Sequence, residues 1–237
     1  MLIAEVLPKV QVSAVSAVRL AIPGYKVYLS FIPDVLCLST VRPRGICIYV
    51  RDSLPCSEVK FLASPFREQL WVNIRLAGSD ILLIGCIYRS PSSPLESTSQ
   101  LSHLLDLVAA SRPSHLLITG DFNAPDIDWA AEVSRAPTGH WSHELLELFR
   151  DHYLTQHVLS PTRYRPGQTP HVLDLVLTNE EGMVLDLRSH PPLGSSDHVV
   201  LTFTLRCYAE VEQVTTLKPA LHRGDYGAMV QMAREAQ

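Results

Sequence analysis

Residues 69–88 read QLWVNIRLAGSDILLIGCIY, and they carry two apolar runs on either side of a short polar turn. Residues 69–76 alternate in part, whereas residues 81–88 form a continuous apolar run typical of a buried strand. Gly78-Ser79-Asp80 between them is a turn signal, so the stretch predicts an antiparallel hairpin. Parallel strands need a much longer crossover, and this turn therefore disfavours a doubly wound parallel sheet.

Further strands and two helices are predicted on both sides of this hairpin. The strand candidates are residues 46–50, 115–119, 172–178, 183–188 and 198–206. Residues 97–111 and 141–153 carry apolar side chains at helical spacing. Strands interspersed with a few helices predict an α/β fold, a four-layer α/β sandwich in which two packed mixed β-sheets are flanked by helices.

The composition is that of an ordinary globular protein. The chain has 237 residues, 46% of them apolar and 19% charged, which suits one large α/β domain or two small ones. Its net charge of −4 weighs against a protein that coats DNA, but it is compatible with an acidic site that binds a cation. No apolar run approaches the ~20 residues of a membrane span, and no signal peptide is evident. The five scattered cysteines indicate reduced thiols in an intracellular protein.

A first polar box, Gly120-Asp121-Phe122-Asn123, follows the apolar run at residues 115–119. On an extended segment Asp121 and Asn123 point to the same side. The carboxylate can orient or deprotonate a water, and the amide can donate to a phosphate oxygen. The alternative is an Asx-turn that closes the strand.

A second polar box, Ser196-Asp197-His198, lies between a Gly-Ser loop and the predicted strand at residues 198–206. Neighbours on an extended strand face opposite ways, so Asp197 and His198 are expected to do separate jobs. Asp197 suits a metal or a water, and His198 suits a phosphate oxygen that gathers negative charge. The alternative is a polar strand start with a surface histidine.

Asp174 lies inside the apolar run VLDLVL at residues 172–177. A carboxylate in such a strand costs several kcal/mol unless it is paired. A histidine is an apt partner because the carboxylate fixes its tautomer and raises its proton affinity. We therefore predict an Asp174–His198 pair, with an exposed carboxylate at a strand edge as the alternative.

The order and spacing of these three boxes resemble the endonuclease/exonuclease/phosphatase superfamily, and within it the apurinic-type endonuclease domain of non-LTR (LINE-type) retrotransposons. The resemblance covers about residues 1–207. It is supported by the stretches PGY (23–25), RGICIYV (44–50), LWV (70–72), IYRSP (87–91), PTR (161–163) and LDLVLTN (173–179).

The resemblance implies a role for each residue of the boxes. Asp121 would activate the attacking water, and Asn123 would help to hold the phosphate. His198, oriented by Asp174, would stabilise the pentavalent phosphate. Tyr88 matches a family tyrosine near the scissile phosphate, with a strand-end aromatic packed in the core as the alternative.

A metal ion and DNA are the implied partners. The family's metal-binding glutamate lies in a motif similar to IAEVLPK at residues 3–9, so Glu5 and Asp197 would bind Mg²⁺, with Mn²⁺ as the alternative. Thr162 and Ser196 match polar residues that line the DNA site, and ordinary loop chemistry is the alternative for Thr162. Arginines near the site would contact phosphates unless they are solvated loop charges; they are Arg42, Arg44, Arg89, Arg163 and Arg165.

The chain also departs from the family pattern. The superfamily starts with an earlier strand that carries an active-site asparagine, and here Met1 lies almost on the Glu5 motif, so we expect that first strand to be missing. We expect the domain to cover residues 1–207, followed by a linker and short C-terminal helix at residues 208–237, without the reverse transcriptase to which such domains are fused.

The sequence thus predicts a Mg²⁺-dependent endonuclease that nicks DNA in the nucleus, with no membrane and no obligate protein partner. Two alternatives stay open. One is a phosphomonoesterase of the same superfamily that acts on an inositol phosphate or a lipid. The other is an inactive, truncated remnant of such a domain.

Overall fold

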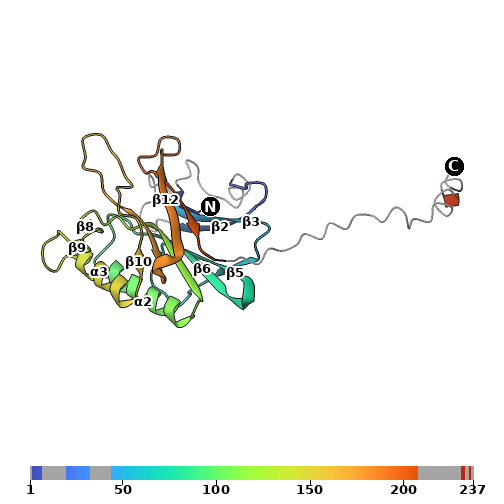
Figure 1. Cartoon of the computed structure of the whole chain (residues 1–237), viewed down its shortest axis with the longest axis horizontal. Helices are drawn as coiled ribbons and strands as arrows, with labels where there is room; N and C mark the ends of the chain where they lie inside the picture. The colour runs from blue at the N-terminus through green and yellow to red at the C-terminus, as the bar shows by residue number, and fades with distance from the viewer. Residues whose placement is uncertain (1, 7–19, 33–43, 208–230, 233–234, 236–237) are drawn as a thin grey trace, which may run out of the picture.

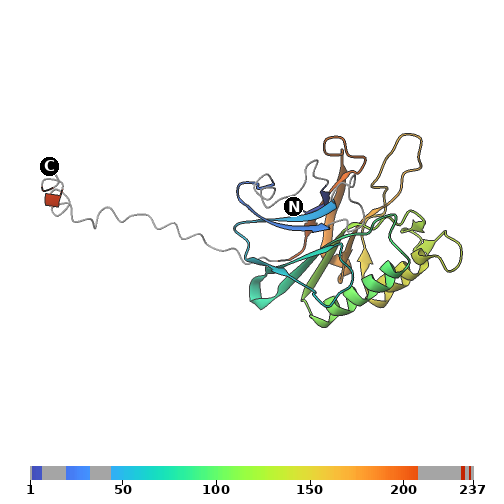
Figure 2. The same ribbon diagram turned by 180° about the vertical axis from the view of Figure 1, so that it is seen from behind.

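The computed structural model describes residues 2–6, 20–32, 44–207, 231–232 and 235, and within residues 2–6 and at residues 31, 32 and 44 it describes the backbone only. Three layers are visible in Figures 1 and 2: two helices lie below a large central sheet, and a second layer of strands lies above it. The predicted linker and C-terminal helix at residues 208–237 lie almost wholly outside the described residues, as do Arg42 and Cys37.

The central sheet has six strands in the order β10-β11-β7-β6-β5-β4. These strands are β4 (Cys56–Val59), β5 (Gln69–Arg75), β6 (Ile81–Tyr88), β7 (His115–Asp121), β10 (Thr155–Gln156) and β11 (Asp174–Thr178). The predicted hairpin is confirmed, because β5 and β6 pair antiparallel from Gln69–Ile87 to Arg75–Ile81. Only β6 and β7 pair in parallel, so the sheet is mixed.

The parallel pairing of β6 and β7 requires a crossover, and helix α2 (Glu96–Ala110) supplies it. Helix α3 (Trp141–Asp151) lies beside α2 on the same face of the sheet (Figure 1). Their inward faces bury the apolar positions of the predicted helical spacing; these are Leu101, Leu104, Leu105 and Val108 of α2, and Leu145, Leu146, Leu148 and Phe149 of α3. Burying them against the sheet forms the first hydrophobic core.

The second β layer covers the other face of the central sheet. One part is a three-stranded sheet of β1 (Leu2–Val6), β3 (Arg44–Arg51) and β2 (Tyr25–Ile32), and the other is the pair β12 (Val184–His190) and β13 (Val200–Leu205). A second hydrophobic core fills the space between the layers. The predicted α/β sandwich is confirmed, but the described strands of this layer pair only antiparallel, and both described helices lie on one side.

Close packing in the central sheet depends on one glycine. Gly85 of β6 pairs with Trp71 of β5, and a Cβ at Gly85 would lie 2.3 Å from the Trp71 ring. The missing side chain therefore lets the large indole lie flat across the neighbouring strand, where it is 1% exposed.

Some predicted boundaries are wrong. The strand predicted from residue 198 begins at Val200, because His198 forms only an isolated bridge with Arg163 and its N–H is bonded to the Ser196 hydroxyl. Strand β2 was not predicted, although it pairs with β3 along its whole length. The sequence also gave no sign of the short hairpin of β8 (Ile127–Asp128) and β9 (Val133–Ser134).

Four cysteines lie in the described part of the chain, and all four are free thiols; they are Cys47, Cys56, Cys86 and Cys207. Among the helices that the structure describes, none combines the length and the apolar character needed to cross a membrane.

Candidate active site

Three polar side chains lie in a row across three neighbouring strands. The register pairs Tyr88 with Asp121 between β6 and β7, and Asp121 with Asp174 between β7 and β11. Paired residues point to the same face of a sheet. That face is the one turned toward the second β layer, because Leu117, four residues before Asp121, and Val176, two residues after Asp174, belong to the core between the layers.

The backbone around Asp121 and Asn123 adopts a tight turn that depends on the glycine at position 120. Gly120 has a φ of +143°, and a Cβ there would lie 1.8 Å from the Ile87 carbonyl oxygen. Asn123 has a φ of 47°, and its N–H donates to Asp121 Oδ1 over 3.0 Å. The extended segment predicted for Asp121 to Asn123 is therefore wrong, and the Asx-turn alternative is what forms.

The Asn123 side chain faces the end of β6. Its Nδ2 donates to the Arg89 carbonyl over 2.9 Å, which uses one of the two amide hydrogens. Asp121 is 4% exposed and Asn123 is partly buried. The carboxylate is thus held at the floor of the site, and the amide retains a second N–H for a ligand.

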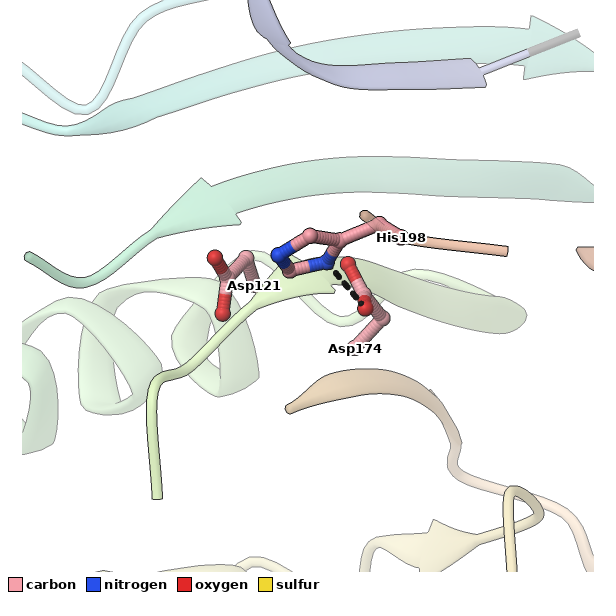
Figure 3. Close-up of side chains that lie close together, drawn as sticks. All are labelled: Asp121, Asp174 and His198. Atoms are coloured by element: carbon pink, nitrogen blue, oxygen red, sulfur yellow. Dashed lines mark hydrogen bonds and ion pairs between the residues drawn. The ribbon is translucent and has the colours of Figure 1, made fainter. Parts of the chain in front are cut away.

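The predicted Asp174–His198 pair is confirmed. His198 Nδ1 donates to Asp174 Oδ2 over 2.7 Å, and Figure 3 shows the imidazole lying between the two aspartates. Because a carboxylate can only accept, this bond uses Nδ1 and leaves Nε2, which lies 4.0 Å from Asp197 Oδ1, as the other ring nitrogen.

The surroundings of His198 favour its protonated form. Burial alone lowers the pKa of the imidazole, but the hydrogen bond and charge of Asp174, with smaller contributions from Asp121 and Asp197, outweigh it. The pKa of His198 is therefore raised above its ordinary value of 6.5. The raised pKa extends to higher pH the range over which the imidazole carries positive charge.

Thr162 holds this pair in place from behind. Its Oγ1 accepts from the N–H groups of both Leu173 and Asp174 over 3.0 Å, and its carbonyl accepts from Val199 N over 2.8 Å. The side chain is 0% exposed. The prediction that Thr162 lines the DNA site is therefore wrong for this structure, because a fully buried hydroxyl cannot meet a ligand.

Asp197 lies in an ion-pair cluster with two arginines. Nε of Arg163 and Nη2 of Arg165 each lie 2.9 Å from Asp197 Oδ2. Burial raises the pKa of the Asp197 carboxyl, but the hydrogen bond and charge of Arg163, with Arg165 adding, hold it below its usual range. The Asp197 carboxylate, predicted to bind a metal, thus already has two cationic partners.

The acidic side chains of the site lie close enough together to hold a cation. Ligand atoms of Asp121, Asp174 and His198 all lie within 4.8 Å of one another. Mg²⁺ takes carboxylate oxygens, so the carboxylates of Asp121 and Asp174 fit such an ion, whereas a protonated His198 has no free lone pair to bind it. Strand β1, which carries Glu5, lies against β6 and β7, but the Glu5 side chain lies outside the described residues, as does that of Arg44.

The remaining predicted residues are divided by burial. Arg89 is 1% exposed, so the prediction that its side chain contacts DNA phosphates is wrong. Tyr88 is 4% exposed and belongs to the core between the layers, as its alternative anticipated. Ser196 is exposed and accepts from the His198 N–H over 3.1 Å, which keeps it at the rim of the site.

The comparisons with known proteins agree with this geometry. A family described as endonuclease-reverse transcriptase matches residues 82–202. The endonuclease domain of TRAS1, a telomere-specific non-LTR retrotransposon, has a TM-score of 0.57 and 20% identity, with 78% of this chain and 81% of that chain covered. No curated protein matches the chain.

Two bacterial structures share the fold at lower identity. An endonuclease/exonuclease/phosphatase family protein from Leptotrichia buccalis has a TM-score of 0.53 and 13% identity, with 85% of this chain and 84% of that chain covered. The 3′ phosphatase NExo from Neisseria, bound to a product DNA hairpin, has a TM-score of 0.50 and 14% identity, with 83% of each chain covered.

Proposed function

Because the chain belongs to the endonuclease-reverse transcriptase family, we propose that it is a Mg²⁺-dependent endonuclease that nicks DNA by hydrolysing a phosphodiester bond. The observation that carries the proposal is that Asp121, at the end of β7, Asp174, at the start of β11, and His198 lie close together. This set combines a buried carboxylate with a carboxylate–imidazole pair, and in-line hydrolysis of a phosphodiester needs both a base for water and a cation for the phosphate.

Each side chain has a step that its environment supports. The Asp121 carboxylate orients the attacking water and takes its proton, while the second N–H of Asn123 donates to a phosphate oxygen. Asp174 raises the pKa of His198, and the protonated ring offers Nε2–H to the oxygen that gathers negative charge in the transition state.

The metal ion would be held by carboxylates of this site. Glu5 and Asp197 are the candidates predicted from the sequence, and an oxygen of Asp121 or Asp174 that is not engaged with the water or with His198 could add to them. When bound, Mg²⁺ polarises the phosphate and meets the charge of the leaving oxygen.

DNA would approach over the exposed rim. Arg163 and Arg165 can exchange Asp197 for a phosphate, and the exposed Ser196 hydroxyl accepts from the His198 N–H beside them in the chain. NExo, which shares the fold, was solved with a product DNA hairpin, and the similar TRAS1 structure is the endonuclease domain of a retrotransposon. Action on chromosomal DNA in the nucleus, by a domain of residues 1–207 that works beside a reverse transcriptase, belongs to the same proposal.

A phosphatase is the second candidate, because NExo is a 3′ phosphatase on the same fold. The described site would serve either reaction, since both attack a phosphorus atom with water. The two differ only in whether the leaving oxygen belongs to an internal or a terminal phosphate.

One experiment separates the candidates. Purified protein is incubated with supercoiled plasmid and, in parallel, with an oligonucleotide bearing a 3′ phosphate, each with Mg²⁺ or with EDTA. We expect Mg²⁺-dependent relaxation of the plasmid, lost in Asp121→Asn and kept in Asp186→Asn, whose aspartate is exposed on β12. Equal plasmid nicking by both variants would refute the endonuclease proposal, phosphate release without nicking would favour the phosphatase, and failure to unfold cooperatively would favour the inactive remnant.

A further inference from the structure

Arg89 is a buried cation directly behind the catalytic turn. It follows the last residue of β6, it is 1% exposed, and its guanidinium carbon lies 3.4 Å from the ring centroid of Trp141, the first residue of α3. Its Nε has no hydrogen-bond partner among the described residues. A desolvated guanidinium so close to an indole face makes a strong cation–π contact.

The backbone of Arg89 is hydrogen-bonded to Asp121 and to Asn123, the two residues of the catalytic turn. The Arg89 N–H donates to the Asp121 carbonyl over 2.8 Å, and the Arg89 carbonyl accepts from Asn123 Nδ2 over 2.9 Å. The position of Arg89 therefore determines where the Asp121 backbone and the Asn123 amide lie.

The side chain keeps its charge in this environment. Burial lowers the pKa of the Arg89 guanidinium to about 10, against a smaller opposing effect of the Glu68 carboxylate. The group is thus protonated at neutral pH and attracts the π face of Trp141. A buried charge is costly unless its surroundings compensate, and the π face of Trp141 provides such compensation for Arg89.

We propose that Arg89 is a positioning residue of the nuclease, whose guanidinium, stacked on Trp141, anchors the chain after β6 so that its backbone holds Asn123 and Asp121 in their reactive places. This inference rests on the proposed endonuclease function for its kinetic readout. We call the Arg89–Trp141 contact the arginine anchor. According to this proposal the arginine anchor affects turnover but not DNA binding.

Three roles of Arg89 make different kinetic predictions. A phosphate contact would weaken DNA binding and reduce the slope of log K against log[salt] by about 1 when the arginine is removed. A merely structural role would lower thermal stability and leave turnover intact well below the unfolding temperature. A positioning role lowers kcat and leaves DNA affinity and its salt slope unchanged.

The test compares Arg89→Met, Arg89→Lys and Trp141→Leu with the control Arg75→Met, which removes an exposed arginine at the opposite end of the central sheet. We expect kcat for plasmid nicking to fall about 10- to 100-fold in Arg89→Met, since a misplacement of about 1 Å costs that much. The kcat of Trp141→Leu should also be lower than that of the wild type, and the kcat of Arg89→Lys should lie between those of Arg89→Met and the wild type. Arg75→Met should have the kcat of the wild type. Unchanged kcat in Arg89→Met, or a loss confined to DNA affinity and salt slope, would overturn the proposal.

Hydrogen–deuterium exchange gives a readout that needs no activity. In Arg89→Met the amides of residues 119–124 should exchange faster, while those of helix α2 keep their wild-type protection. Unchanged exchange in residues 119–124 would overturn the arginine anchor even if the wild-type protein nicks no DNA. Conversely, if the wild type nicks no DNA but the amides of residues 119–124 exchange faster in Arg89→Met, the endonuclease proposal is refuted and the arginine anchor is not.

Discussion

The two halves of the candidate site are built in different ways. The strand half, Tyr88, Arg89, Asp121 and Asn123, lies at the ends of the parallel neighbours β6 and β7, and Tyr88, Arg89 and Asp121 are at most 4% exposed. The loop half, Thr162, Arg163, Asp197 and His198, comes from segments more than 30 residues apart, joined by side-chain bonds and ion pairs.

This difference assigns different physical properties to the halves. Buried groups fixed by backbone hydrogen bonds cannot move without breaking the sheet, which suits the base and the phosphate-holding amide. Half-exposed ion pairs contribute little stability and exchange partners readily, which suits groups that meet DNA. The strand half therefore sets where the reaction occurs, and the loop half is able to respond to the substrate.

The largest expected effect is in the strand half. Gly120→Ala places a Cβ 1.8 Å from the Ile87 carbonyl oxygen at a φ of +143°, so the two strands must separate at the site. We expect a loss of roughly 4 kcal/mol or more in the free energy of unfolding, measured by urea denaturation.

Gly139→Ala is the matched control, because Gly139 has a φ of +83° but no atom within 4 Å of the added Cβ. It should cost about 1–2 kcal/mol, the penalty of left-handed backbone alone. Equal losses of unfolding free energy in the two variants would show that Gly120 is not required for the close approach of β6 and β7.

The next effect tests the support behind the loop half. Thr162→Val keeps the shape of the side chain but removes the acceptor of the Leu173 and Asp174 N–H groups. Leaving these buried donors unsatisfied should cost about 1–3 kcal/mol in the free energy of unfolding.

Thr98→Val is the comparison for that variant, since Thr98 is 3% exposed and its Oγ1 has no hydrogen-bond partner among the described residues. This substitution should be neutral or stabilising. If Thr162→Val were equally harmless, the assignment of Thr162 as the support of Asp174 would be wrong.

A smaller effect concerns the proton on His198. Asp174→Asn removes the hydrogen-bonded charge that outweighs burial, so the pKa of His198 should fall, as measured by NMR titration of its ring protons in metal-free protein. In the wild type the folded-state pKa lies above the unfolded value of 6.5. The stability that this pair contributes is therefore fully present below pH 6.5 and lost as pH rises through the folded pKa, and the variant should show a shallower loss over that window. An unchanged titration would contradict the pairing.

The smallest effect on stability is expected at the rim. Arg165→Met removes an exposed partner of Asp197 and should change the free energy of unfolding by no more than about 0.5 kcal/mol. In a DNA-binding titration over a range of salt concentrations, the slope should fall by about 1 if Arg165 neutralises a phosphate. An unchanged slope would remove Arg165 from the proposed DNA contacts.

Local patterns were enough to predict the strand half in outline. The apolar run before Gly120-Asp121-Phe122-Asn123 predicted β7, and the turn at Gly78-Ser79-Asp80 predicted the β5–β6 hairpin. The pairing of Asp174 with His198 was predicted as well, because a carboxylate in an apolar strand demands a partner. These inferences depend on the periodicity of apolar residues and on the presence of a charged residue within an apolar run, and both can be read directly from the sequence.

The burial of individual polar residues was not predictable in the same way. Arg89 and Arg163 both stood near the boxes as candidate phosphate contacts, and only the packing of Trp141, 52 residues further along the chain, places Arg89 inside. Likewise nothing near Thr162 in the sequence indicates that its hydroxyl accepts from residues 173 and 174.

The sequence by itself thus determined the two helices, most strands of the central sheet and the chemical groups proposed for the site, because helical and strand periodicity and motif order are local properties. The tertiary structure decided which of those groups face a ligand and which hold others in place. The physical reason is that exposure and hydrogen-bond partnership depend on segments distant in the chain, as when α3 covers Arg89 and the segment at Thr162 supports Asp174.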